Sequence, residues 1–271
     1  MGMQTSDKLM NMLVRGLRSV ALVGVVILLA ASGVQADEIR VMTSGAFAAA
    51  LQALKPDFER ASGSTLTIVS GAGAPDSIPN RLQRGEQTDV VIMAAAGIDE
   101  LVTAGRVVPR SRVDLARSSI GIAVRAGAPK PDISTVDALT RALLQAKSVA
   151  YSSSVSGVYV STELFQRLGI ASQMAAKSRR IAREPVAEVV ARGEAELGFQ
   201  QISELRPVAG VEVIGPLPAA VQRVTVFAAA AGAGSPNPAG GRALIAFLAS
   251  PAASAAIEKS GMDPVTAVPK P

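Results

Sequence analysis

Apolar residues along this chain switch repeatedly between the spacing of a buried strand and that of an amphipathic helix. The continuous apolar run at 90–93 is typical of a buried parallel strand. Leu51, Leu54 and Phe58 instead recur at helical spacing. This alternation predicts a doubly wound α/β fold. The predicted strands cover 38–42, 65–69, 90–93, 119–125, 148–150, 196–200, 211–214 and 223–228, with helices between most of them and two more in 239–259.

The order of the predicted strands divides the chain into two lobes. Connections between elements are short, and no stretch reads as a long linker. The chain leaves its first group of strands near Ile120 and returns to it near Val224. We therefore expect two doubly wound lobes joined by a two-strand hinge. The expected boundaries are 37–118 plus 223–271 for lobe 1, and 119–222 for lobe 2.

Residues 1–36 have the pattern of a secretory signal peptide. Lys8, Arg15 and Arg18 precede an uncharged apolar run at 20–31, and Ala36 ends a small-residue cleavage motif. The run is shorter than the roughly 20 residues that span a bilayer, so an uncleaved anchor is the weaker reading. We expect a periplasmic protein with no membrane insertion after cleavage.

The amino-acid composition excludes several kinds of catalytic and binding site. The chain has no histidine and no cysteine, which excludes Ser-His-Asp and Cys-His nucleophiles, thiolate or histidine zinc sites, and disulfides. Its net charge of +5 comes partly from the signal region, and aromatic residues make up 3% without a basic stripe, so nucleic-acid binding is not expected. We expect no metal and no cofactor. Any catalysis must use Glu, Asp, Lys, Tyr or Ser.

The most informative polar stretch is 151–159, Tyr-Ser-Ser-Ser-Val-Ser-Gly-Val-Tyr. It lies between a predicted strand and a predicted helix. Free backbone N–H groups and the positive end of a helix dipole attract anions at such a turn, and serine hydroxyls add donors. Similar turns occur at 44–46 and 73–77, and polar residues follow the strand at 196–200. Ligands bind at the carboxyl ends of strands in α/β folds, so these loops predict a small-anion site.

Two segments resemble a known family. Ser156-Gly157-Val158-Tyr159 is similar to the Pro-Ala-Gly-x-Tyr loop of periplasmic type II solute-binding proteins, in the molybdate-binding-protein-like branch. Residues 191–199, Ala-Arg-Gly-Glu-Ala-Glu-Leu-Gly-Phe, are similar to that family's helix-to-strand turn. The resemblance covers the chain from Ile39 to about Gly261. It implies two lobes that close on an oxyanion, an ABC transporter permease as partner, and a monomer.

The resemblance also implies a set of ligand-binding residues. The family's first-loop serine falls at about Ala46, its tyrosine is replaced by Gln201, and an otherwise apolar position holds Arg183. A guanidinium fork suits a carboxylate, and an amide both donates and accepts, so an organic acid is favoured over molybdate. The predicted ligand-binding residues are Ser44, Gly45, Ala46, Gly73, Ser77, Ser154, Ser156, Gly157, Val158, Tyr159, Arg183 and Gln201.

A second resemblance points to an enzyme. Residues 200–205, Gln-Gln-Ile-Ser-Glu-Leu, look similar to the aconitate isomerase family, which uses the same scaffold to interconvert cis- and trans-aconitate. A proton shift of that kind needs a base within hydrogen-bonding reach of the carbon acid. Glu204, Glu184, Tyr151 and Tyr159 are the candidates, and the sequence leaves the choice open. The sequence thus favours a binding protein for an ABC importer, with aconitate isomerase as the alternative.

Overall fold

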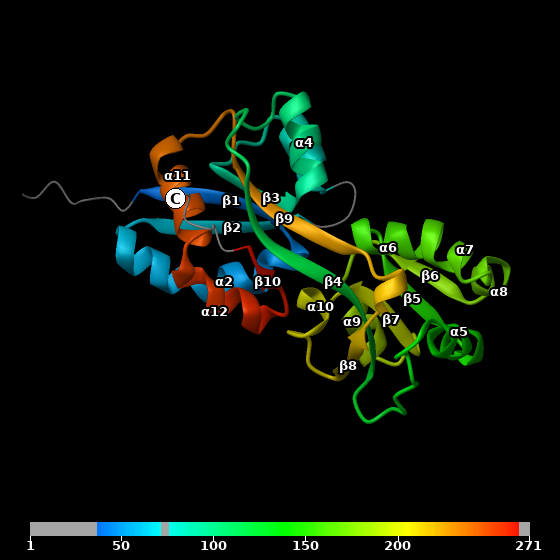
Figure 1. The fold of residues 1–271 in the computed structure, drawn as a ribbon. Coiled ribbons are helices and arrows are strands. Elements are labelled where there is room, and N and C mark those ends of the chain that lie inside the picture. Colours follow the sequence, from blue (N-terminus) through cyan, green and yellow to red (C-terminus); the bar gives the residue numbers. More distant parts are fainter. Residues whose placement is uncertain (1–36, 72–75, 266–271) are drawn as a thin grey trace, which may run out of the picture. The chain divides into compact units, whose positions relative to one another are not determined.

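The computed structural model describes residues 37–71 and 76–265. The predicted signal peptide and Gly73 of the second loop lie outside these residues. The α/β fold class is confirmed, with one continuous path of hydrogen-bonded strands in the order β2-β1-β3-β9-β4-β7-β5-β6 (Figure 1). Strand β8 (Val211–Pro216) and strand β10 (Asp263–Pro264) pair with β4 outside this path.

The first half of the sheet is a parallel core with antiparallel neighbours. Strand β1 pairs in parallel with β2 and β3, and β9 runs antiparallel to both β3 and β4. Its strands are β1 (Glu38–Ser44), β2 (Thr65–Gly71), β3 (Val90–Ala94), β4 (Val113–Arg125) and β9 (Val224–Ala231), and its helices are α2 (Gly45–Ser62), α3 (Ile78–Gln83), α4 (Ala95–Thr103), α11 (Pro238–Leu248) and α12 (Pro251–Ser260).

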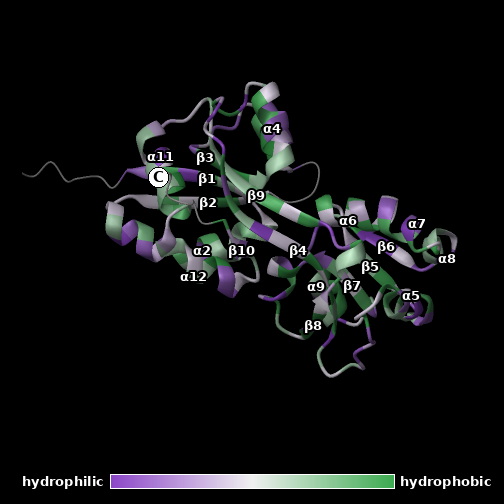
Figure 2. Ribbon diagram, in the orientation of Figure 1, coloured by the Kyte–Doolittle hydropathy of each residue, from purple (hydrophilic) through white to green (hydrophobic). Residues whose placement is uncertain are grey.

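Alternating side chains place a hydrophobic cluster on each face of this half. Val90 and Ile92 of β3 join the cluster that contains Phe47 of α2 and Leu244 of α11. Val91, between them, joins the cluster beneath α3 and α4. A strand buried on both faces reads as a continuous apolar run, which is why the sequence located β3. Figure 2 shows hydrophobic and hydrophilic residues alternating around α4 and α12, as expected for helices with one buried face.

The second half repeats the same strand arrangement. Strand β5 pairs in parallel with β6 and β7, and β4 runs antiparallel to β7 and β8. Its strands are β5 (Val149–Ser152), β6 (Ser178–Ile181) and β7 (Leu197–Gln201), and its helices are α5 (Val136–Gln145), α6 (Val155–Tyr159), the π-helix η1 (Val160–Leu164), α7 (Phe165–Arg167), α8 (Ala171–Ala175), α9 (Val186–Ala191), α10 (Ile202–Leu205) and the short 3-10 helix η2 (Ala219–Val221).

Strand β4 connects the two halves. Residues 113–119 pair with β9, whereas residues 120–125 pair with β7 and β8. Figure 1 shows β4 and β9 running together between the two groups of strands. The change of partner falls next to the predicted lobe boundary at 118/119. The assignment of 37–118 plus 223–271 and of 119–222 to separate lobes stays a proposal.

Three sequence predictions were wrong in detail. β4 begins at Val113, not at 119, because exposed Arg117 hides the strand pattern. The polar segment around 178–181 is the edge strand β6, in which Arg179 and Arg180 are exposed. Ser134 and Asp137 have the spacing of a capping box, but Thr135, not Ser134, caps α5, its hydroxyl accepting from the Ala138 N–H at 3.1 Å. Single-residue shifts of this kind are common at helix starts.

No single helix in the described ranges is both long and apolar enough to cross a bilayer. Helices α11 and α12 pass that test only as a pair bent by 70°. Both helices contribute side chains to the core, among them Leu244, Leu248 and Ile257.

Candidate functional site

The 18-residue helix α2 begins at Gly45, directly after β1. Ser44 is the N-cap residue, but its side chain makes no capping hydrogen bond. The Ser44 Oγ is buried, and within the described part of the chain it is the one buried side-chain oxygen or nitrogen that lacks a partner. A buried hydroxyl without a partner is costly, and the first N–H groups of a helix attract anions. The sequence prediction of Ser44 and Gly45 as ligand contacts is compatible with this placement and stays a proposal.

The turn from β5 to α6 gathers three hydroxyls. Ser152 Oγ lies 2.7 Å from Ser154 Oγ and 3.1 Å from Ser156 Oγ, and the last two are 3.3 Å apart. Ser156 is buried, whereas Ser154 is exposed at the N-cap of α6. Such a cluster has rotatable protons to offer a ligand. The sequence prediction of Ser154 and Ser156 as ligand contacts is compatible with this placement and stays a proposal.

The end of β7 carries a glutamate whose ionisation is perturbed. Glu204 occupies the third position of α10, after the N-cap residue Gln201. Desolvation raises the pKa of Glu204 to about 7, and hydrogen bonds from the Gln200 side chain and the Gln201 backbone oppose the rise. The side chain as a whole keeps intermediate exposure, so the carboxyl is enclosed but not sealed from solvent. This is a carboxyl that exchanges protons near neutral pH.

Glu204 and the amino end of α2 meet. Helix α10 contacts α2, and Glu204 Oε1 lies 2.5 Å from the point that a Cβ on Gly45 would occupy. A methyl group at position 45 would force the Glu204 carboxyl to shift. The positive end of the α2 dipole favours the ionised form and so acts against desolvation. A proton acceptor and an anion-attracting helix end therefore lie side by side.

The free energy of unfolding should fall between about pH 5 and pH 8 because of Glu204. Because its pKa rises from 4.5 to about 7 on folding, the folded state holds the proton more tightly. Stability from the neutral carboxyl is present below the unfolded pKa and is lost as pH rises through about 7. The upper bound is about 3 kcal/mol, reduced by the α2 dipole. Urea denaturation of wild type and Glu204→Gln at pH 5 and pH 8 measures this, and parallel pH dependence in the two proteins would contradict it.

The remaining candidate bases are engaged elsewhere. Glu184 is exposed and pairs with Arg192 at 2.8 Å. The Tyr151 ring packs edge-on against Phe165, with centroids 6.3 Å apart. Tyr159 is buried, and its hydroxyl donates to the Val221 carbonyl at 2.6 Å. Tyr159 therefore fastens α6 to the chain that enters β9.

The other predicted ligand-binding residues lie on α2, at the start of α3, on α6 and between β6 and α9. Ser77 caps α3 without a side-chain hydrogen bond, and Ala46 is buried in the core. Val158 is 53% exposed on α6. Arg183 is exposed between β6 and α9 and forms no ion pair with the described residues. Gly157 allows close packing, because a Cβ there would lie 1.7 Å from the Ser152 carbonyl oxygen.

Sequence reasoning missed a polar group around Gln201. Ser118, Ser203 and Thr225 are all buried, and each lies next to Gln201 or to another member of the group. Ser118 and Ser119 directly precede the apolar run of β4 that begins at Ile120, which was the available signal. Nowhere in residues 37–71 and 76–265 do three or more His, Cys, Asp or Glu side chains gather in a way that could hold a metal ion.

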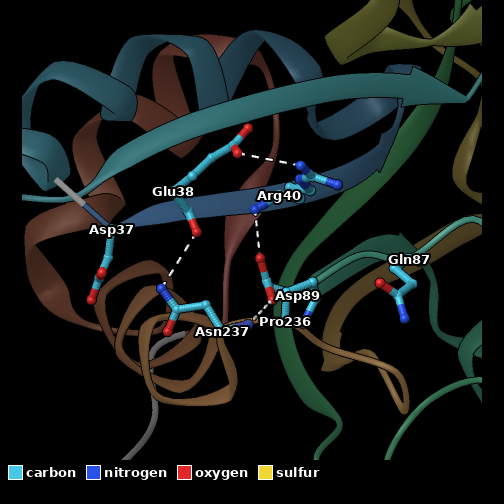
Figure 3. Close-up of a pocket in the computed structure, with 7 residues that line it drawn as sticks. All are labelled: Asp37, Glu38, Arg40, Gln87, Asp89, Pro236 and Asn237. Atoms are coloured by element: carbon cyan, nitrogen blue, oxygen red, sulfur yellow. Dashed lines mark hydrogen bonds and ion pairs between the residues drawn. The ribbon is translucent and has the colours of Figure 1, made fainter. Parts of the chain in front are cut away.

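A separate pocket of about 640 Å³ opens at the other edge of the sheet (Figure 3). It lies at the amino ends of β1 and β3, away from Ser44 and Glu204. Asp89 is buried beneath it and accepts from the Arg40 N–H, the Ser235 hydroxyl and the Asn237 N–H at 2.6–2.7 Å. Asp89 thus ties β1 and β3 to the start of α11. The lining residues are Asp37, Glu38, Arg40, Gln87, Asp89, Pro236 and Asn237.

Asp89→Asn should destabilise the fold without changing ligand binding. An amide nitrogen in place of one carboxylate oxygen faces donors and breaks at least one buried hydrogen bond, at a cost of about 2 kcal/mol. The loss is measured as the shift of the urea midpoint. Asp37→Asn is the matched control, because Asp37 lines the same pocket but is exposed. Equal midpoints for the two variants would contradict the structural role of Asp89.

Comparison with known sequences finds a matching family and a similar protein. Residues 39–263 match the family model described as bacterial extracellular solute-binding protein. The chain is 47% identical over 234 residues to a protein named aconitate isomerase from a Pseudomonas species, covering 85% of this chain and 89% of that protein.

Solved structures with similar folds are more distant in sequence. The periplasmic molybdate-binding protein of Azotobacter vinelandii superposes with a TM-score of 0.68 at 20% identity, over 86% of this chain and all of that one. The sulfate-binding protein of Mycobacterium tuberculosis gives a TM-score of 0.67 at 17% identity, over 84% of this chain and 87% of the other. At such identities the likeness concerns the fold alone.

Proposed function

Because this chain belongs to the family of bacterial extracellular solute-binding proteins, we propose that it binds a small polycarboxylate outside the cytoplasm and interconverts cis- and trans-aconitate. The observation that carries the proposal is the Glu204 carboxyl, with a pKa raised to about 7, beside the amino end of α2. The identity to an aconitate isomerase supports the same reaction. We therefore propose the enzyme ahead of the binding protein that the sequence favoured.

The reaction needs only a proton shift. Aconitate has a CH₂ group between a carboxylate and a carbon–carbon double bond. Removing one CH₂ proton leaves a carbanion delocalised over the former double bond and its carboxylate. Returning a proton to the former vinyl carbon moves the double bond to the other side of the central carbon, and the product can have the opposite geometry. One proton leaves and one arrives, so no oxidant or reductant is consumed.

Glu204 suits both proton transfers. A carboxyl with a pKa near 7 is a stronger base than an ordinary glutamate and is still partly ionised at neutral pH. After taking the proton from CH₂, the same carboxyl holds it for the second carbon. A single group near the operating pH serves as base and then as acid.

The helix turns supply the anion-binding part of the site. The N–H groups at the start of α2 and the Ser44 hydroxyl would hold one carboxylate and stabilise the charge that develops on it. The Ser152–Ser156 hydroxyl cluster and exposed Arg183 would take the other carboxylates. These assignments require the loops to approach one another around the ligand.

The second candidate is a binding protein that delivers an anion to an ABC importer. The match to the solute-binding protein family favours this candidate. The Ser44 turn also fits it, since a hydroxyl-lined helix end can capture an anion without any proton transfer. In both readings the protein is exported, as residues 1–36 predict.

Incubating the purified protein with cis-aconitate tests the proposal. Proton NMR follows the appearance of trans-aconitate, and calorimetry measures binding of aconitate, citrate, molybdate and sulfate. Turnover supports the isomerase. Binding of one anion without turnover would replace it with the importer reading, and no binding or turnover would overturn both.

A further inference from the structure

The Gln201 amide is enclosed in a hydrogen-bonded network. Gln201 is 2% exposed. With its Oε1 facing Thr225, it accepts from the Thr225 hydroxyl at 3.1 Å, and its Nε2 donates to Ser118 Oγ at 2.9 Å and to the Ser119 carbonyl at 3.2 Å. This orientation satisfies all three neighbours, so it is the one that the network selects.

The partners of Gln201 belong to the two strands that connect the halves of the molecule. Ser118 of β4 and Thr225 of β9 are directly opposite each other in the β4–β9 ladder. The backbone of Gln201 is paired with Ile120 of β4. Ser118 Oγ also lies 3.5 Å from Ser203 Oγ at the start of α10. One side chain therefore joins both connecting strands to the end of β7.

We infer that Gln201 is a positioning residue that holds α10, and with it Glu204, against the connecting strands, rather than a residue that contacts ligand. Its amide has its hydrogen-bonding groups occupied by protein and is buried, so little is left to offer an anion. Gln201 is the N-cap of α10, only three residues before Glu204. This inference rests on the proposed role of Glu204 as the base.

Gln201→Met tests the inference, because methionine keeps the length and volume but removes the hydrogen bonds. Gln222→Met is the matched control: the Gln222 amide also bonds β4, at the Ile120 N–H and carbonyl, but its hydrogen bonds do not reach α10. We expect Gln201→Met to lower kcat for aconitate at least about tenfold, since small displacements of a reacting group are costly. KM and the calorimetric Kd should stay within about twofold of wild type, and Gln222→Met should match wild type in kcat.

If Gln201→Met does not fold, Thr225→Val replaces it in the test. This variant should also lower kcat. A rise of Kd with kcat unchanged would make Gln201 a ligand contact and overturn the inference, as would unchanged kcat in both variants. If wild type shows no turnover, the proposed function fails separately. The inference is then tested by measuring the pKa of the Glu204 carboxyl by ¹³C-glutamate NMR. This pKa should change in Gln201→Met and stay as in wild type in Gln222→Met. An unchanged pKa in Gln201→Met would overturn the inference.

Discussion

Replacing Glu204 by glutamine should lower kcat for aconitate isomerisation by about 100- to 10,000-fold, the usual contribution of a general acid–base group. Glutamine has nearly the same shape but neither accepts nor returns the proton. The hydrogen-bonding amide still fits beside Gly45, so the Kd for trans-aconitate should change little. Proton NMR of the reaction and calorimetry of binding measure the two quantities on the same preparation.

Glu184→Gln is the control for this result. Glu184 was an equal candidate in the sequence, but it is exposed and paired with Arg192. Its loss removes a surface ion pair of small energetic value and should leave kcat near that of wild type. Full activity in Glu204→Gln would show that the base is another group. Loss of activity in both variants would point to a shared effect on folding, which the melting temperature would reveal.

Gly157→Ala should destabilise the protein by about 3 kcal/mol or more. The added methyl group would lie 1.7 Å from the Ser152 carbonyl oxygen and 2.6 Å from its carbonyl carbon. Both are backbone atoms of β5, so the clash cannot be relieved by turning a side chain, and α6 or β5 must move. Urea denaturation measures the loss, and the Kd for aconitate should rise because the serine cluster is displaced.

Gly127→Ala separates this clash from the general cost of replacing glycine. Gly127 has a left-handed φ of 76° and no atom within 4 Å of an added Cβ. Its cost is therefore that of the backbone conformation, about 1 kcal/mol. If Gly157→Ala costs no more than Gly127→Ala, the close packing of α6 on β5 is not important for stability.

The serine turns and Glu204 differ in how far the sequence alone predicts their place in the candidate site. Ser44, Ser154 and Ser156 were located because each lies between a strand pattern and a helix pattern, and such turns fall at the carboxyl edge of an α/β sheet. Glu204 was a candidate among four. Glu204 differs from the other three because its carboxyl is buried beside Gly45, more than 150 residues earlier in the chain. No local sequence pattern contains that information.

Gln201 shows the reverse case. Its place at the end of a strand predicted a ligand contact, because polar residues there commonly face a ligand. In the folded chain the amide is hydrogen-bonded to Ser118, Ser119 and Thr225, from which we infer a positioning role. Whether a strand-end side chain meets ligand or neighbouring strands depends on which strands pass beside it, and strand order is a property of the whole fold.

The sequence by itself determined the α/β class, most strands and helices, and the serine-rich turns between them, because hydrophobic periodicity and helix-start chemistry are local. It did not locate edge strand β6 or the first part of β4, since exposed arginines obscure their alternation. Only the tertiary structure decided which titratable group is desolvated and which amides and hydroxyls are already paired. Those properties depend on contacts between residues far apart in the chain, and desolvation at such a contact separates Glu204 from the other glutamates.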